Sequence, residues 1–493
     1  MTESPTYVEV QTPAGRVRGA WREVAGSSVR SASFLGIPFA QAPVGELRFA
    51  APRAVEPWPD VRDALEQGAT AQRGDPGVTL IPEPSVPGES TLNANVFTPA
   101  PGDTAAKLPV LVWIHGGGYV AGSPASPWYD GRAFNRDGVV TVSIGYRLGF
   151  DGFGHIDGAP SNRGVRDWLA GLEWVQQNIA AFGGDPSRVT IAGQSAGGGA
   201  VLTLLGMPAA QHLFHGVYAL SGALADVAPE RARAFSAKMA RELGVPATRE
   251  GFSSVSEEDV LAAQRKLSQL DLSSMGETVD EGLGLGPAVD GDLIIRPTAQ
   301  SLAQGVGADK PLVLGATDDE FSMAVQDQAS KLRWIPLALL LRPFKLTSAV
   351  RRGYLAANQP VVARGHAAVL GRLITDKMFR TGVVKTARAR GAAPTWVYRI
   401  AFRSTKFDAA VHCIDVPFFF DCLDGPVVDA LTGPHPPQAL ADAIHAAAVA
   451  FVKTGDPGWT AWSAVPDSGV VFGAPPATQT EETGGFASVE PLL

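Results

Sequence analysis

The chain has 493 residues, 45% of them hydrophobic, and a formal net charge of -8 at pH 7. This apolar content is enough for a large buried core and excludes a disordered or low-complexity protein. The acidic balance, without a run of Lys or Arg long enough to follow a phosphate backbone, argues against nucleic acid as a partner.

Targeting signals and cysteines indicate where the protein works. The N-terminus lacks the basic and then apolar segments of a signal peptide, and the most apolar later stretch, Trp334 to Leu341, is interrupted by Pro336 and too short to span a bilayer. We therefore expect a cytoplasmic protein with no membrane partner. The only cysteines, Cys413 and Cys422, form no disulfide framework, and no second Cys or His pair completes a zinc site, so no metal is expected.

Strand and helix patterns alternate along the chain. Short apolar runs predict buried strands, and apolar residues at every third or fourth position predict a helix over residues 165–182, ended by Gly183-Gly184-Asp185-Pro186. This order is typical of parallel strands with helices on both faces, where ligand sites lie at the carboxyl ends of the strands. The predicted strands are 109–114, 139–144, 189–192, 311–314 and 396–398, and a further helix covers 200–205.

Two long stretches carry no strand pattern. Residues about 225–278 and 322–392 are rich in helix signals, so we expect them to leave the sheet as insertions that form a substrate cap. The only linker-like segment is the polar tail from Pro475 to Gly485. Nothing marks a domain boundary, which predicts one catalytic domain over residues 1–493.

The pentapeptide Gly193-Gln194-Ser195-Ala196-Gly197 has the G-x-S-x-G form of a nucleophile turn. Such a turn runs sharply from a strand into a helix and exposes the serine hydroxyl. The pentapeptide alone could be a plain glycine-rich loop. Because a predicted strand precedes it and a helix follows, Ser195 is the candidate nucleophile.

An oxyanion hole is predicted from two segments. The backbone N–H of Ala196 directly follows the serine, and His115-Gly116-Gly117-Gly118 follows a strand with the HGGG form, so Gly117 and Gly118 are the other candidate donors. Residues 116–121 also fit a relaxed dinucleotide-binding pattern, but Gly122, Pro124 and Pro127 interrupt the helix that a pyrophosphate would need. We expect His115 to shape this loop.

The base and the acid should follow the serine in the order acid, then histidine. Of the later histidines, His412 comes after a strand and a short loop, whereas His366, His435 and His445 lie in cap, proline-flanked and helical contexts. The acid lies within Asp318-Asp319-Glu320, just past a strand, and the residues alone do not choose among the three.

Several segments together resemble the type B carboxylesterase family, which includes para-nitrobenzyl esterases, carboxylesterases and cholinesterases. The likeness runs from about Gly15 to Trp459 and includes Phe34-Leu-Gly-Ile-Pro-Phe-Ala, Trp113-Ile-His-Gly-Gly-Gly-Tyr119, Asn178-Ile-Ala-Ala-Phe-Gly-Gly-Asp-Pro186 and Gly193-Gln-Ser-Ala-Gly-Gly198. The family's acid motif, G-x-x-x-D-E-G, falls on residues 315–321 and implies Glu320 as the acid, and H-G-x-E-x-P-F falls on residues 412–418.

The resemblance also implies the fold and the reaction. It implies an α/β-hydrolase fold with a large, mixed, mostly parallel sheet, helices on both faces, no cofactor, and a deep gorge leading to the serine. The chain departs from the family at Phe321 and Cys413, which replace glycines, and at Asp415 and Gly145, which replace Glu and Asn; we expect these to change the pocket more than the chemistry. Gln194 stands where cholinesterases carry Glu, which argues against choline esters.

We thus expect a serine carboxylesterase that hydrolyses small-molecule carboxylic esters through an acyl-enzyme. Ser195 would attack, His412 would accept its proton, Glu320 would orient His412, and the amides of Gly117, Gly118 and Ala196 would stabilise the oxyanion. We expect the activity to fall as His412 becomes protonated, near pH 6 to 7, on the order of an ordinary histidine pKa.

The alternatives are a non-catalytic binding relative and a hydrolase of thioesters, carbamates or lactones. A penicillin-recognising enzyme is disfavoured because no S-x-x-K motif occurs. The sequence leaves the oligomeric state open.

Overall fold

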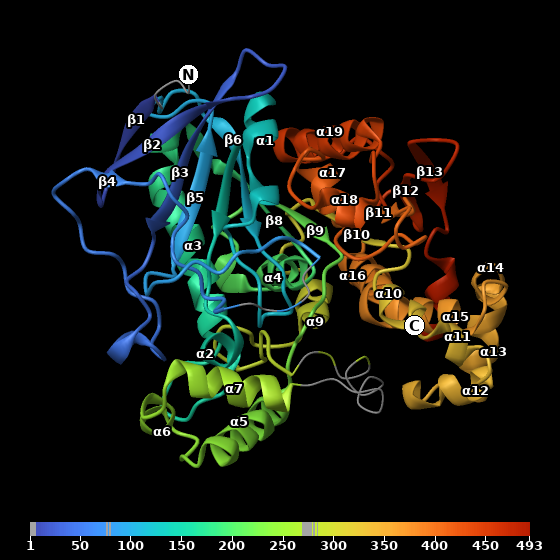
Figure 1. The fold of residues 1–493 in the computed structure, drawn as a ribbon. Helices are drawn as coiled ribbons and strands as arrows, with labels where there is room; N and C mark the ends of the chain where they lie inside the picture. The colour runs from blue at the N-terminus through green and yellow to red at the C-terminus, as the bar shows by residue number, and fades with distance from the viewer. Residues whose placement is uncertain (1–5, 75–76, 78–79, 269–278, 280–281, 283) are drawn as a thin grey trace.

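A large mixed β-sheet runs through the molecule, from the antiparallel strands near the N-terminus to a C-terminal hairpin (Figure 1). The computed structural model describes residues 6–74, 77, 80–268, 279, 282 and 284–493. Neighbouring strands follow the order β1-β2-β3-β5-β7-β6-β8-β9-β10-β11-β12-β13, and β4 pairs with β2 off this path. The strands are β1 Tyr7–Thr12, β2 Gly15–Glu23, β3 Arg30–Pro38, β4 Arg62–Asp63, β5 Asn93–Thr98, β6 Leu108–Ile114, β7 Val140–Ile144, β8 Gly184–Gln194, β9 Gly216–Leu220, β10 Leu312–Thr317, β11 Thr395–Ile400, β12 Ser468–Phe472 and β13 Gln479–Thr483.

The central strands β7, β6, β8, β9, β10, β11 and β12 are parallel to one another. Their carboxyl ends therefore meet at one edge of the sheet. The five strands predicted from apolar runs all lie among these, which confirms the expected large and mostly parallel sheet. Because both faces of such strands are covered, they consist of nearly continuous apolar residues, and every residue of β7, β9 and β10 is buried.

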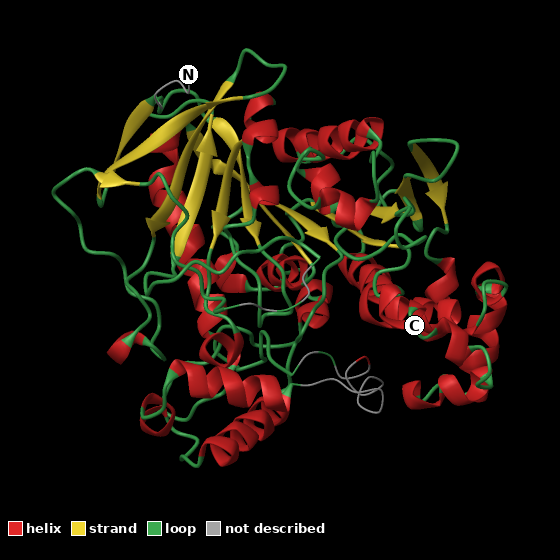
Figure 2. Cartoon of the chain, viewed as in Figure 1, coloured by secondary structure: helices red, strands yellow, loops and turns green. Residues whose placement is uncertain are grey.

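Helices cover both faces of the sheet (Figure 2). Val110, Val112 and Ile114 of β6 belong to one core with residues of α3 and α4, whereas Leu111 and Trp113 belong to a second core with residues of α17 and α19. This division follows from the alternation of side chains along a strand. The helices are α1 Arg132–Arg136, α2 Gly149–Phe153, α3 Arg163–Asn178, α4 Ala196–Leu205, α5 Pro229–Leu243, α6 Arg249–Ser253, α7 Glu257–Leu267, α9 Thr298–Ala303, α10 Met323–Gln326, α11 Ala329–Leu332, α12 Leu337–Leu340, α13 Ser348–Ala357, α14 Gln359–Val362, α15 His366–Thr375, α16 Thr381–Arg390, α17 Val416–Phe419, α18 Val428–Thr432 and α19 Gln438–Thr454.

The two stretches expected to form caps are helical where the structure describes them. Helices α5 to α7 occupy the first and α10 to α16 the second, and no strand occurs in residues 225–268 or 322–392. The end of the first stretch, residues 269–278, lies outside the described residues. A π-helical turn, Asp376–Arg380, joins α15 to α16. The role of these helices as a substrate cap stays a prediction.

The sequence patterns missed strands at both edges of the sheet. The antiparallel strands β1, β2, β3 and β5 and the short strand β4, which is parallel to β2, were not predicted. The polar tail expected to be linker-like contains β13, which pairs antiparallel with β12. Strand β13 reads Gln-Thr-Glu-Glu-Thr and is almost wholly exposed, so its side chains carry no burial pattern. Among the described residues, no helix is long and apolar enough to cross a membrane.

Candidate active site

Ser195 lies on a sharp turn between β8 and α4, at the carboxyl edge of the sheet. Its backbone has φ 59° and ψ -122°, a region that residues other than glycine rarely adopt. The flanking glycines allow this turn: a Cβ on Gly193 would lie 2.5 Å from the backbone of Gly197, and one on Gly197 would lie 2.0 Å from the carbonyl oxygen of Ile114. The predicted strand, turn and helix around Ser195 are all present.

Ser195, His412 and Glu320 form a continuous hydrogen-bonded chain. His412 Nε2 lies 2.9 Å from Ser195 Oγ, and His412 Nδ1 lies 2.5 Å from Glu320 Oε2. The other carboxylate oxygen of Glu320 accepts a hydrogen bond of 2.8 Å from the Thr317 amide, and the His412 amide donates to the Glu320 carbonyl oxygen at 2.8 Å. These contacts orient the imidazole so that its Nε2 faces the serine.

The neighbouring carboxylates, Asp318 and Asp319, form ion pairs with arginines instead. Asp318 pairs with Arg380 at 2.7 Å, and Asp319 pairs with Arg372 at 3.2 Å. The structure therefore brings only Glu320 of this acidic triplet to the histidine. This is the choice that the family motif implied and that the residues alone left open.

The remaining candidate histidines have other contacts. His445 Nδ1 lies 2.8 Å from the Phe419 carbonyl oxygen, and His366 Nδ1 lies 3.3 Å from that of Leu332. His115 lies 2.9 Å from the Gly116 carbonyl oxygen and stacks on Tyr146 at 4.4 Å, and burial lowers its pKa to about 4, so it stays neutral. His115 thus shapes the glycine loop, as expected.

The three predicted oxyanion donors line one cavity with Ser195. Gly117 and Gly118 adopt φ 97° and 61°, conformations that favour glycine, and Ala196 begins α4. Within the described part of the chain, none of these three amides donates to a protein acceptor. They are therefore available to a ligand beside the serine hydroxyl.

The charge state of His412 depends on two opposing effects. Burial disfavours the imidazolium and lowers its pKa, whereas Cys413 and the Glu320 carboxylate raise it, and the net result is a pKa well above the usual histidine range. Burial also raises the pKa of the Cys413 thiol, so this group is neutral near pH 7. At that pH, the negative charge that raises the pKa of His412 is therefore the Glu320 carboxylate.

The cavity at Ser195 has a volume of about 290 Å³ and is mainly apolar. Its phenylalanine side chains are those of Phe321 and Phe379. The full lining is Leu80, Ile81, Glu83, Gly116, Gly117, Gly118, Ala121, Gln194, Ser195, Ala196, Ala223, Phe321, Met378, Phe379, His412 and Cys413.

Sequence patterns missed part of this lining. Met378 and Phe379 come from the π-helical turn, a feature that often occurs at functional sites but has no sequence signal of its own. The rings of Phe321 and Phe379 lie 4.8 and 5.1 Å from that of His412. Phe321 and Cys413, two of the departures from the family pattern, both line the cavity, and their effect on its shape stays a prediction.

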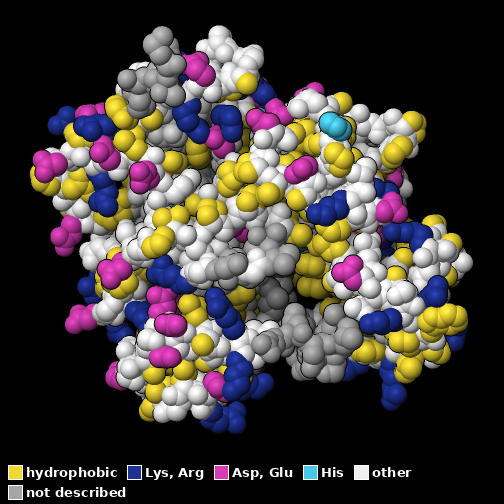
Figure 3. All heavy atoms as spheres, viewed as in Figure 1, with side chains coloured by type: hydrophobic (Ala, Val, Ile, Leu, Met, Phe, Trp, Pro, Cys, Tyr) yellow, Lys and Arg dark blue, Asp and Glu magenta, His cyan; other side chains and the backbone are white. Residues whose placement is uncertain are grey.

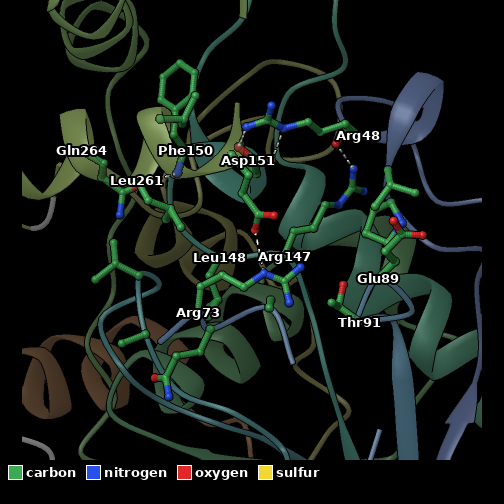
Figure 4. A pocket seen from close by; sticks show the side chains of 18 of the residues that line it. Arg48, Arg73, Glu89, Thr91, Arg147, Leu148, Phe150, Asp151, Leu261 and Gln264 are labelled. Carbon is green, nitrogen blue, oxygen red and sulfur yellow. Dashed lines mark hydrogen bonds and ion pairs between the residues drawn. The ribbon is translucent and has the colours of Figure 1, made fainter. Parts of the chain in front are cut away.

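A second cavity, of about 470 Å³, shares only Ala121 with the first. Figure 4 shows part of its lining, including Arg48, Arg147 and Asp151. Two of its arginines form close ion pairs with carboxylates: Arg48 with Asp151 at 2.8 Å, and Arg147 with Asp167 at 2.6 Å. None of the triad residues lines this cavity. No cluster of His, Cys, Asp or Glu within the described residues is arranged to hold a metal ion.

Comparisons with known proteins agree with this geometry. The model of the family described as "Carboxylesterase family" matches residues 6–472. The para-nitrobenzyl esterase of Bacillus subtilis (strain 168) is 33% identical over 476 residues, which cover 92% of this chain and 91% of that protein. The liver carboxylesterase of Sus scrofa is 33% identical over 430 residues, 80% of this chain and 75% of its own length.

Solved structures match along nearly the whole chain. The carboxylesterase EST55 of Geobacillus stearothermophilus at pH 6.2 superposes with a TM-score of 0.83 at 31% identity and covers 98% of both chains. A structure of a PNB esterase gives a TM-score of 0.78 at 30% identity and covers 99% of this chain. The expected α/β-hydrolase fold is confirmed by these neighbours.

Proposed function

Since the chain belongs to the carboxylesterase family and is a carboxylic ester hydrolase, we propose that it works through an acyl-enzyme formed on Ser195. The observation that carries the proposal is the hydrogen-bonded chain from Ser195 through His412 to Glu320, at 2.9 and 2.5 Å. A nucleophile, a base within hydrogen-bond reach and a third group that orients the base are the requirements for this chemistry.

In the first half-reaction, Ser195 Oγ attacks the ester carbonyl carbon while His412 Nε2 accepts the hydroxyl proton. Glu320 keeps the Nδ1 proton in place and stabilises the imidazolium that forms. The amides of Gly117, Gly118 and Ala196 donate to the oxygen that becomes negative. His412 then gives its proton to the leaving alcohol, and the acyl group stays on Ser195.

In the second half-reaction, water attacks the acyl carbon and His412 accepts one of its protons. The carboxylic acid leaves as the proton returns to Ser195 Oγ, so the enzyme regains its starting state. Gln194, whose Nε2 lies 3.2 Å from His412 Nε2, is neutral and places no additional charge beside the imidazolium.

The cavity lining supports small esters with apolar acyl or alcohol groups as substrates. Phe321, Phe379, Met378, Leu80 and Ile81 give it an apolar wall around the serine. A cytoplasmic location is part of the proposal. It is supported by Cys413 and Cys422, which are both free and buried.

The test is hydrolysis of para-nitrophenyl esters of increasing acyl length by wild type and Ser195→Ala. We expect Ser195→Ala to lose about 10⁶-fold in kcat, because nothing else in the site can form the acyl-enzyme. Ser221→Ala is the matched control: Ser221 is another buried serine, directly after β9, and its Oγ has no hydrogen-bond partner within the described residues.

The two variants separate the mechanisms. Activity in wild type and Ser221→Ala with none in Ser195→Ala supports the proposal. The rates with esters of increasing acyl length then give the acyl preference of the pocket. Equal rates in all three proteins would remove Ser195 from the mechanism and favour a non-catalytic role for this site.

A further inference from the structure

Charge is distributed very unevenly along this chain. The 48 residues from 328 to 375 contain eight of the 41 Lys and Arg residues and none of the 49 Asp and Glu residues. This occurs in a protein whose net charge is -8. The segment includes α11 to α15 and forms the lobe at the lower right of Figure 1.

The first part of this lobe exposes large apolar side chains to solvent. Trp334, between α11 and α12, is 76% exposed, and Leu339 on α12 is 54% exposed. Leu341 and Phe344, by contrast, are only 1% and 3% exposed, in a core of their own lobe. The segment therefore has a packed inner side and an apolar outer side.

Four exposed cations occur in the same stretch of the chain, residues 331–345, as these apolar groups. We call Lys331, Arg333, Trp334, Leu339, Arg342 and Lys345 the basic–apolar face; all six are exposed. Within the described residues, no carboxylate forms a salt bridge with any of its cations. Arg333 instead lies over the Trp334 ring, with 4.8 Å between its guanidinium carbon and the ring centroid. Figure 3 shows hydrophobic and basic side chains side by side over these helices.

We propose that the basic–apolar face docks the enzyme on the surface of an anionic lipid bilayer. Clusters of Lys and Arg are attracted to anionic headgroups, and this attraction strengthens binding about fivefold for each residue near the surface. Trp prefers the boundary between headgroups and acyl chains, and exposed leucines add apolar area that enters this boundary. An acidic protein would pair with the cations, but such pairing gives no reason for the exposed Trp334 and Leu339 between them.

Docking at this lobe would place the catalytic cavity close to the bilayer. Phe321 and Met378 line the cavity at Ser195 and also pack against the core of the lobe. A bilayer held at the lobe would thus lie next to the helices that wall the catalytic cavity, and apolar esters concentrate in bilayers. Docking itself does not depend on the proposed reaction. Docking on a bilayer departs from the expectation of no membrane partner, which rested on the missing signal peptide and on the lack of an apolar stretch long enough to span a bilayer.

The experiment measures binding of the full chain to vesicles by co-sedimentation. Vesicles of phosphatidylcholine alone are compared with vesicles of equal parts phosphatidylcholine and phosphatidylglycerol. The test variant carries Arg333→Gln, Arg342→Gln and Lys345→Gln. The matched control carries Arg233→Gln, Lys238→Gln and Arg241→Gln, which removes the same charges from exposed positions of α5.

We expect tight binding to the anionic vesicles only, weakened about 100-fold in the test variant, because each of three cations contributes about fivefold. The control variant should change binding less than threefold. Trp334→Ala should weaken binding several-fold, whereas Ile295→Ala, at another exposed apolar residue, should not. High salt should reverse binding, since the attraction is screened.

Three results would overturn the proposal: no preference for anionic vesicles, equal losses in the test and control triple variants, or binding to soluble polyglutamate as strong as binding to vesicles. The last would assign the face to an acidic protein instead. Because Ser195→Ala keeps the basic–apolar face, it should bind vesicles like wild type, which separates failure of docking from failure of the catalytic proposal.

Discussion

At the scale of single residues, the site is defined by which carboxylate reaches His412. Glu320 is fully buried and contacts the imidazole, whereas Asp318, two residues earlier, pairs with Arg380. A strand that ends in a turn can point successive side chains in different directions, so three adjacent acids serve two purposes. One contacts His412, and the others pair with arginines: Asp319 with Arg372 of α15, and Asp318 with Arg380 of the π-helical turn.

This difference predicts the effect of replacing each acid. Glu320→Gln should lower kcat by about 10⁴-fold, because it removes the charge that stabilises the imidazolium and disturbs the tautomer of His412. Asp318→Asn should stay within about tenfold of wild type, since Asp318 does not contact the histidine. Steady-state kinetics with a para-nitrophenyl ester measures both. A larger loss in Asp318→Asn would contradict the assignment.

The acidic limb of the pH profile follows from the pKa of His412. Only the neutral imidazole accepts a proton, so kcat/KM should rise as pH increases through this pKa. Because the Glu320 carboxylate raises the pKa, the limb should lie above the ordinary value of about 6.5. In Glu320→Gln the limb should move to lower pH. A flat wild-type profile from about pH 5 to 9, or a limb that does not move in the variant, would contradict this role.

At the scale of elements, the glycine loop after β6 and the turn after β8 meet at the carboxyl edge of the sheet. Gly117 can only be glycine here: its φ is 97°, and a Cβ would lie 2.1 Å from the carbonyl oxygen of Ala121. Gly118 also has a positive φ, 61°, but its Cβ would meet nothing closer than 4.0 Å. Gly118→Ala is therefore a matched control for Gly117→Ala: both add a Cβ at a positive φ, but only the one at Gly117 clashes.

Gly117→Ala should lower kcat by about 10² to 10³-fold, the loss typical of one oxyanion donor, because the clash displaces the loop. Gly118→Ala should cost less than about tenfold, since it adds only the modest strain of a left-handed alanine, about 1–2 kcal/mol. The ratio of the two kcat values, with both proteins shown to be folded by circular dichroism, is the measurement. Equal losses would mean that the Gly117 clash does not matter.

Five of the central strands, the serine turn and the glycine loop were predictable because their signals are local, whereas β9 and β12 were not predicted and the choice of Glu320 rested on the family resemblance. A buried parallel strand is a short apolar run, and a nucleophile turn or a glycine loop has a defined form at the end of such a strand. The edge strand β13 was not predictable, since its side chains are almost all exposed and its sequence therefore has no pattern of buried apolar residues. Met378 and Phe379 could not be placed at the site either, because only the packing of the distant helical lobe brings them to Ser195.

At the scale of the whole molecule, burial of acids makes the fold sensitive to pH. Asp415 is 1% exposed, and burial, together with the charge of Glu320, raises its pKa to about 7. The Tyr398 hydroxyl donates to its Oδ2 at 3.2 Å, but within the described residues its Oδ1 has no partner. The folded protein thus keeps this proton to a pH at which the unfolded chain has released it.

The free energy of unfolding should therefore decrease as pH rises from about 4 to 7, which is the range between the pKa of Asp415 in the unfolded chain and in the folded protein. The expected contribution of this one group is a few kcal/mol. Asp415→Asn cannot ionise, so the decrease in Tm between pH 5 and 8 should be smaller than in wild type by roughly 3 °C. The control is Asp185→Asn, since the pKa of Asp185 is lowered from an already acidic value and does not titrate in this interval. Calorimetry at both pH values measures the difference. Identical decreases in wild type and Asp415→Asn would show that Asp415 is ionised throughout.

The central claim, that Ser195 forms a covalent intermediate, is tested most directly by trapping it. A para-nitrophenyl alkylphosphonate should react with Ser195 Oγ, with the oxygen–phosphorus bond forming as para-nitrophenolate leaves. Mass spectrometry of the digested protein locates the label, and residual esterase activity is measured on the same sample. We expect one label per chain, on the peptide that contains Ser195, with loss of activity in proportion to labelling and no reaction in Ser195→Ala. Full activity in a fully labelled protein, or a label at another residue that alone accounts for the inactivation, would contradict the account.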